Sequence, residues 1–164
     1  MAMLSFDIRS LAHTAVVVDD VLGPDDPVWE DGDIMPAEPL HVKGRLSPAG
    51  EGRYYWHGSL TGSVNLECSR CLGPSSATVS DDTHIIFAES GAGDVVDDPD
   101  VFMLGDRQNE LDLRPAIREQ WLLNVPAYAL CRDDCKGLCA TCGAELNAGD
   151  CGCTAAQKDV RSDA

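Results

Sequence analysis

The cysteines occur in four close pairs, and this spacing constrains the fold more than any other feature of the sequence. Six of them lie within CRDDCKGLCATCGAELNAGDCGC, and two lie earlier, within ECSRC. Zinc prefers four ligands in a tetrahedral arrangement, and a close pair of cysteines turns two sulfur atoms toward one ion. The spacing therefore predicts two zinc sites of four thiolates each, with ligands drawn from Cys68, Cys71, Cys131, Cys135, Cys139, Cys142, Cys151 and Cys153.

The distances along the chain predict how the eight cysteines divide between the two sites. Cys139, Cys142, Cys151 and Cys153 are close enough in sequence to surround one ion, and neighbouring glycines permit a tight return of the chain. We regard this rear site as the better supported of the two. The front site then combines Cys68 and Cys71 with Cys131 and Cys135, and it would fasten two distant segments together because metal binding contributes to folding.

Two other interpretations of Cys68 and Cys71 are unliganded thiols and a redox-active pair. A thioredoxin-type pair opens a helix after a strand. This pair instead lies in a predicted hairpin, without a helix dipole to lower a thiol pKa. Catalytic zinc often has histidine ligands and an open position. None of the histidines lies in a cysteine pair, and each is interpreted as a surface or core residue: His13, His41, His57 and His84. We therefore expect structural metal sites and no catalytic residues.

Length and patterning predict a single α+β domain over residues 1–164 with a curved antiparallel sheet or partial β-barrel. Residues 1–125 are expected to form a β-rich body with acidic loops. Residues 126–153 are expected to form a zinc-knuckle or ribbon-like element, and residues 154–164 a disordered tail. The composition, with 44% hydrophobic and 24% charged residues, is typical of a globular protein.

Individual elements are predicted from periodicity. Residues 55–68 alternate between small or apolar side chains and polar ones, which predicts a long strand. Residues 76–80 and 83–88 predict the returning strand, so that ECSRC lies at the tip of a hairpin. LSFDIRSL, TAVVV and HVKGRL are interpreted as shorter strands. Two acidic stretches are interpreted as loops: the first is DDVLGPDDPVWEDGDIMPAEP, and the second runs from Glu89 to Asp106. Helical spacing of Leu113, Ile117 and Trp121 predicts a helix over about residues 112–124, with Asp112 as its N-cap.

The charge balance restricts the partners. Twelve basic residues against 28 acidic residues give a net charge of −16, which disfavours broad binding to a phosphate backbone. This negative net charge suits a basic protein partner or simply maintains solubility. No apolar run is long enough to cross a membrane, and the start of the sequence does not resemble a signal peptide, so we expect a cytoplasmic protein.

The combination of LECSRC, ELDLRPAIREQWLLNVP and the cysteine-rich segment resembles the YceD family, the large ribosomal RNA subunit accumulation proteins. The resemblance covers roughly Leu40 to Cys153. Its most specific part is GLCATCG from Gly137, followed by Leu146-Asn147 and Cys151-Gly152-Cys153. Family members more often have proline where this chain has Ala140, a difference that leaves the cysteines unchanged.

The resemblance implies a non-enzymatic, metal-binding factor that supports synthesis, processing or stability of large-subunit (23S) ribosomal RNA. It implies a ribosomal protein or pre-ribosomal particle as partner, with limited rRNA contact, and no membrane or small-molecule substrate. Arg70, Arg132 and Lys136 could contact RNA or offset the thiolate charge. Two alternatives remain: a thiol-based redox switch or chaperone that uses the same cysteines, and an acidic escort of a basic ribosomal protein.

Overall fold

The computed structural model describes residues 4–92 and 101–153, and the predicted tail at 154–164 lies outside them. Contacts divide the chain into two compact units. Unit 1 comprises Met1–Val64 and Thr78–Val125, and unit 2 comprises Asn65–Ala77 and Pro126–Ala164. The long strands β4 (Arg53–Glu67) and β5 (Pro74–Ala88) contribute residues to both units, whereas the two helices α1 (Ile8–Leu11) and α2 (Arg114–Asn124) belong to unit 1.

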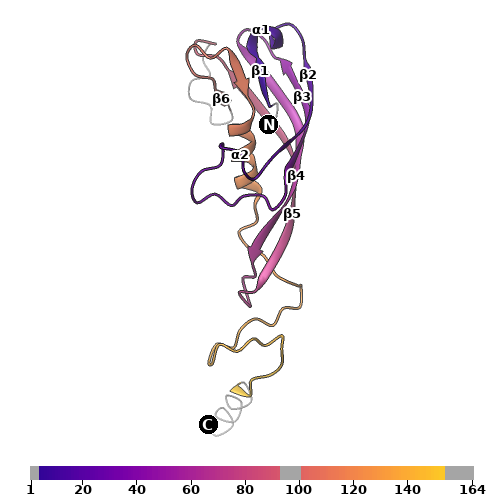
Figure 1. Cartoon of the computed structure of the whole chain (residues 1–164), viewed down its shortest axis with the longest axis vertical. Helices are drawn as coiled ribbons and strands as arrows, with labels where there is room; N and C mark the ends of the chain where they lie inside the picture. Colours follow the sequence, from indigo (N-terminus) through magenta and orange to yellow (C-terminus); the bar gives the residue numbers. More distant parts are fainter. Residues whose placement is uncertain (1–3, 93–100, 154–164) are drawn as a thin grey trace, which may run out of the picture. The chain divides into compact units, whose positions relative to one another are not determined.

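Unit 1 is built on a five-stranded sheet in the order β2-β3-β4-β5-β6. Its strands are β2 (Val16–Leu22), β3 (Leu40–Pro48), β4 (Arg53–Glu67), β5 (Pro74–Ala88) and β6 (Val101–Met103). Strands β2, β3 and β4 pair antiparallel, whereas β6 pairs parallel with β5. The fold is thus α+β with a curved sheet, as predicted, but the parallel pairing of β6 makes the sheet mixed rather than wholly antiparallel. The sheet is not closed into a barrel (Figure 1).

A second, two-stranded sheet joins β1 (Ser5–Asp7) to β7 (Glu110–Asp112). The interpretation of LSFDIRSL as one strand is wrong, because Asp7 accepts a hydrogen bond from Ser10 N and starts the short helix α1 (Ile8–Leu11). The interpretation of the second acidic stretch as loop alone is also incomplete. It contains β6, whose three residues give too short a pattern to detect from sequence.

The alternating pattern of the long strand reflects burial. Trp56, Gly58, Leu60 and Val64 are buried on one face of β4, while most of their polar neighbours are exposed or half-buried. Gly58 faces Gly44 across the strand pair, and Trp56 covers both, so a Cβ atom at either glycine would collide with the opposite backbone. These glycines therefore let the tryptophan lie flat against the sheet.

The helix α2 (Arg114–Asn124) lies along one face of this sheet (Figure 1). The three apolar residues that predicted this helix, Leu113, Ile117 and Trp121, are all buried, and Ala116 is buried beside them. The predicted N-cap is wrong by one position, because Leu113 occupies the cap without a side-chain hydrogen bond. Asp112 nevertheless supports the first turn by accepting a hydrogen bond from Arg114 N at 3.0 Å.

The first acidic loop is fastened to α2. Asp33 accepts hydrogen bonds from Arg118 at 2.6 and 2.9 Å, and its side chain is only 9% exposed. The Trp121 indole donates to Ile34 O at 2.7 Å, and Ala37 N donates to Ser63 O at 2.8 Å. The acidic side chains therefore cover the helix through directed contacts instead of forming a free surface excursion.

Candidate metal centres in unit 2

The turn between β4 and β5 brings Cys68 and Cys71 to one side of a tight loop. Cys68 N donates to Gly73 O at 2.8 Å, and Leu72 N donates to Cys68 O at 2.9 Å. Leu72 has a positive φ of 61°, which is uncommon for a residue other than glycine. The chain thereby completes its reversal within the turn, as the predicted hairpin requires.

The segment that follows α2 returns to this turn and is hydrogen-bonded to it. Ser69 N donates to Ala129 O at 2.7 Å, and the Ser75 hydroxyl donates to Leu130 O at 3.0 Å. The Arg70 guanidinium donates to Cys135 O at 3.0 Å. These contacts align Cys131 and Cys135 with the two cysteines of the turn.

The four cysteines of the front cluster, Cys68, Cys71, Cys131 and Cys135, lie with their sulfur atoms within 4.8 Å of one another. Cys68 Sγ lies 3.7 Å from Cys135 Sγ, and Cys71 Sγ lies 3.6 Å from Cys131 Sγ. Cys68, Cys71 and Cys135 are buried, while Cys131 is exposed. Four sulfurs, each about 2.3 Å from a zinc ion in a tetrahedron, lie about 3.8 Å apart, whereas a disulfide requires about 2.0 Å. The spacing fits a shared metal ion and does not fit a disulfide.

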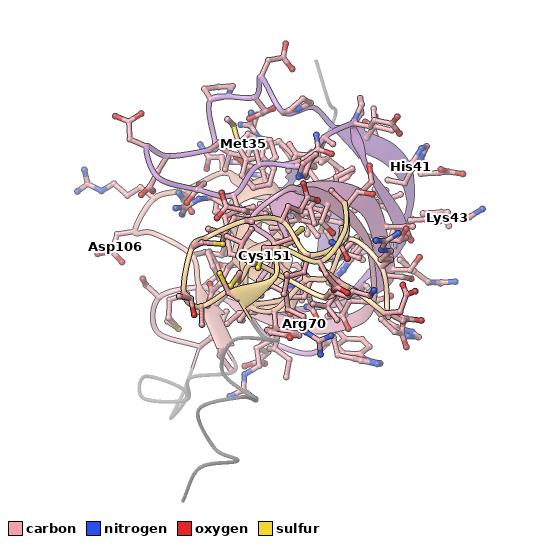
Figure 2. The ribbon with its side chains drawn as sticks, turned by 90° about the horizontal axis from the view of Figure 1, so that it is seen from below. Met35, His41, Lys43, Arg70, Asp106 and Cys151 are labelled. Atoms are coloured by element: carbon pink, nitrogen blue, oxygen red, sulfur yellow. The ribbon has the colours of Figure 1, made fainter. Side chains whose placement is uncertain are left out.

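The rear cluster consists of Cys139, Cys142, Cys151 and Cys153, whose sulfur atoms also lie within 4.8 Å of one another. Its knuckle is closed by Cys139 N donating to Ala144 O at 2.8 Å and by Gly143 N donating to Cys139 O at 2.9 Å. Thr141 N points at Cys139 Sγ at 3.4 Å. Figure 2 shows the labelled Cys151 among yellow sulfur atoms.

Asn147 connects the loop of the rear cluster to a ligand position of the front cluster. Its amide Nδ2 donates to Cys135 Sγ at 3.3 Å, and its Oδ1 accepts from Lys136 N at 2.9 Å. Leu146 N adds a bond to Gly137 O at 2.9 Å. The Leu-Asn of the sequence motif therefore has a structural explanation: it orients Cys135 as an outer-shell partner orients a metal ligand.

Backbone amides stabilise the thiolate form at the first cysteine of each hairpin or knuckle turn. The Cys71 amide, with smaller contributions from the Cys131 and Arg70 amides, lowers the pKa of Cys68 to about 6. The Cys142 and Thr141 amides lower the pKa of Cys139 to about 6. Although the hairpin lacks a helix dipole, as expected, it does lower a thiol pKa through its own amides. Zinc binds the thiolate form, so these turns favour metal binding.

The basic residues near the front cluster contact the protein itself. Arg70 Nε donates to the Tyr128 hydroxyl at 3.3 Å, in addition to its bond with Cys135 O. This hydrogen bond raises the pKa of Arg70, and the nearby thiols of Cys135 and Cys68 add to the effect. The positive charge of Arg70 thus lies close to the cysteines of the front cluster. Arg132 lies 3.6 Å from Asp134 on the exposed surface.

The structure brings all eight predicted cysteines together in the two predicted groups of four. The sequence did not predict the contacts of Asn147, although this residue lies between the two cysteine pairs of the rear cluster. The histidines are also interpreted singly from the sequence, whereas the rings of His57 and His84 stack in unit 1 with their centroids 4.2 Å apart. The sequence would have placed His57 and His84 on the same face of the sheet only if the pairing register of β4 and β5 had been known.

Comparison with known proteins decides the family. The family model described as "Large ribosomal RNA subunit accumulation protein YceD" matches residues 56–164, well over half of the chain. The chain belongs to the YceD family. The match begins later than the resemblance inferred from sequence, and it includes both cysteine clusters and α2.

The curated relatives of this YceD protein share about a quarter to a third of the aligned residues with it. A chloroplastic YCED homolog 1 of Arabidopsis thaliana, described as a large ribosomal RNA subunit accumulation protein, is 26% identical over 58% of this chain and 38% of its own length. The uncharacterized protein Rv2926c of Mycobacterium tuberculosis is 33% identical over 49% of this chain and 39% of its own length. The matched region thus spans about two-fifths of these relatives. No solved structure matches this chain.

Within the described residues, no helix is long and apolar enough to cross a membrane.

Proposed function

We propose that this protein is a non-enzymatic zinc-binding factor of ribosome biogenesis and that it supports synthesis, processing or stability of large-subunit ribosomal RNA. In this proposal each four-cysteine cluster binds one Zn²⁺ ion, and the metal has a structural role because all four ligand positions are supplied by the protein. Residues 126–153 then form a zinc-knuckle or ribbon-like element. The family name supplies the biological process, and the cysteine geometry supplies the chemistry.

The main support for a structural role of the metal is the composition of the buried core of unit 2. Among the described residues of unit 2, every buried hydrophobic residue is a cysteine: Cys68, Cys71, Cys135 and Cys139. Residues 126–152 contain an isolated bridge between Leu138 and Glu145 but no helix or longer strand. A unit with so little apolar burial needs another source of folding free energy, and small domains commonly obtain it from a bound metal. Zinc would stabilise unit 2 by making metal-binding free energy part of its folding.

The partner in this proposal is a ribosomal protein or a pre-ribosomal particle in the cytoplasm. A net charge of −16 favours a basic protein surface over the phosphate backbone as the main contact. Contact with rRNA would be limited, because Arg70 is already engaged by Tyr128 and Cys135. The proposal includes no small-molecule substrate and no membrane.

Complementation tests the proposal in cells. The chromosomal gene is deleted in the source organism, and mature large-subunit rRNA is measured relative to small-subunit rRNA. The wild-type gene is expected to restore the ratio, whereas Cys139→Ser is expected to fail although the protein accumulates. The exposed-residue variant Glu145→Gln serves as control and is expected to restore it. A normal rRNA ratio in the deletion strain would contradict the role in biogenesis.

A further inference from the structure

A second type of ligand cluster lies on the exposed face of the long strands in unit 1. Tyr55 and His57 occupy alternate positions of β4, and Asp82 and His84 occupy alternate positions of the neighbouring β5. Because side chains alternate between the two faces of a strand, these four residues project from the same face. The side chains of His57, Asp82 and His84 are 51%, 69% and 53% exposed, so the cluster is open to solvent.

Both imidazole rings direct Nε2 toward one carboxylate. His57 Nε2 lies 3.2 Å from Asp82 Oδ1, and His84 Nε2 lies 3.6 Å from Asp82 Oδ2. The two rings stack with an interplanar angle of 11°. One ligand atom from each of the three residues lies within 4.8 Å of the others. Two nitrogens and one oxygen are therefore gathered around one point in space.

The opposite, buried face of the same strands fixes the register of this cluster. The Trp56 indole donates to Thr83 Oγ1 at 2.9 Å, and the Thr83 hydroxyl donates to Gly58 O at 3.1 Å. Trp56 precedes His57, and Thr83 lies between Asp82 and His84 in the sequence. Because this pair is buried in the core, the exposed ligand atoms are carried on a rigid support.

We propose that His57, Asp82 and His84 form a binding site for a divalent transition-metal ion of the kind that prefers imidazole and carboxylate ligands, such as Ni²⁺ or Zn²⁺. Two neutral imidazoles and a carboxylate suit such ions, whereas the four-thiolate clusters of unit 2 provide a softer environment. The site is independent of the cysteines, since it belongs to unit 1 and has no sulfur ligand. Water completes the coordination of the exposed ion.

Tyr55 is the positioning residue of this site. Its hydroxyl is hydrogen-bonded to His84 Nδ1. When a metal occupies Nε2 of His84, the proton of the neutral ring resides on Nδ1, and Nδ1–H donates a hydrogen bond to the Tyr55 oxygen. Such a partner fixes both the tautomer and the orientation of a ligand histidine, and its removal typically weakens metal affinity by about 10–100-fold.

Nickel titration of the full chain with its cysteines preloaded with Zn²⁺ tests the proposal. Binding is measured by isothermal titration calorimetry, and the His ring signals are followed by NMR. We expect one saturable Ni²⁺ site, with the signals of His57 and His84 broadened at the lowest Ni²⁺ concentrations. His57→Ala and His84→Ala are each expected to weaken binding by at least about tenfold, because removal of a ligand costs at least as much as removal of its outer-shell partner.

The matched control is His41→Ala, because His41 is exposed on β3 and projects outward from the sheet in Figure 2. Its Ni²⁺ affinity is expected to equal that of the wild type. Tyr55→Phe retains the ring but loses the hydroxyl, so it is expected to weaken Ni²⁺ binding without a shift of the thermal midpoint of unit 1. Equal Ni²⁺ affinity in the wild type, His57→Ala and His84→Ala would overturn the proposal. The cluster would then be a stacked imidazole pair hydrogen-bonded to Asp82.

Discussion

The role of Asn147 gives a prediction that spacing alone does not make. Asn147→Ala removes the donor to Cys135 Sγ and the acceptor for Lys136 N. Asn147 lies in sequence between Cys142 and Cys151 of the rear cluster, yet its hydrogen bonds reach the front cluster. The substitution is therefore expected to weaken zinc binding at the front site more than at the rear site.

The size of the effect follows from the two bonds. A hydrogen bond between neutral groups contributes about 1 kcal/mol net, and one to a charged group contributes about 1.5–3 kcal/mol. The Asn147 bond to the Cys135 thiolate belongs to the second kind, but the site is partly solvated. The two bonds together would contribute about 2.5–4 kcal/mol, and partial solvation reduces the expected loss to about 2 kcal/mol, which corresponds to about 30-fold weaker zinc affinity.

The assay uses protein loaded with ¹¹³Cd²⁺, whose NMR spectrum gives a separate signal for each four-sulfur site. A chelator is titrated into wild type, Asn147→Ala and the control Glu145→Ala, which alters an exposed side chain two positions away. The front signal of Asn147→Ala is expected to disappear at the lowest chelator concentration. Equal chelator resistance in Asn147→Ala and wild type, or earlier loss of the rear signal, would refute the reasoning.

Three further predictions address the ligands, the sheet and the acidic loop. Cys68→Ser and Cys139→Ser are each expected to lose one zinc ion by native mass spectrometry, and the ion lost comes from a different cluster in each. Gly44→Ala is expected to destabilise unit 1 by about 1–3 kcal/mol in urea, because its Cβ would collide with the backbone of β4. Asp33→Asn is expected to lower the thermal midpoint at neutral pH. The hydrogen bond from Arg118 lowers the pKa of Asp33 below its ordinary value of 3.8, so this contribution is present above pH 3.8 and vanishes as the pH falls through the lowered value.

Each of these predictions has a control. Cys131→Ser must lose the same ion as Cys68→Ser, and loss of the ion of the rear cluster would contradict the division into two groups. Ser59→Ala, on the exposed face of β4, is expected to leave urea stability nearly unchanged. The tryptophans at positions 29, 56 and 121 all belong to unit 1, so their fluorescence reports its unfolding separately from metal loss in unit 2. A destabilisation by Asp33→Asn that does not diminish as the pH falls below 3.8 would argue against the ion pair as its cause.

The sequence predicted the features that depend on a strong local pattern. The alternation along β4 and the helical spacing of α2 correspond to burial on one face, where Trp56 and Trp121 are fully buried. The division of the cysteines followed from chain reach, since Cys151 and Cys153 are close to Cys139 in sequence while Cys68 is not. Local periodicity and loop length are therefore informative even without a homologous structure.

The features that were missed depend on tertiary contacts. β6 has three residues, and its parallel pairing with β5 is determined by its neighbours rather than by its own sequence. The short helix α1 arises from a capping bond of Asp7 that interrupts an otherwise strand-like segment. The meeting of His57 with His84 depends on strand register, which is set by the buried contact between Trp56 and Thr83.

The most direct test of the proposed function is the zinc content of the intact chain. Protein purified without chelator is analysed by inductively coupled plasma mass spectrometry, and its accessible thiols are titrated before and after metal removal. If each cysteine cluster binds one zinc ion, we expect two tightly bound equivalents of zinc per chain. The eight thiols should then become reactive as the metal is removed. Less than about half an equivalent of zinc, with all eight thiols reactive from the start, would contradict it.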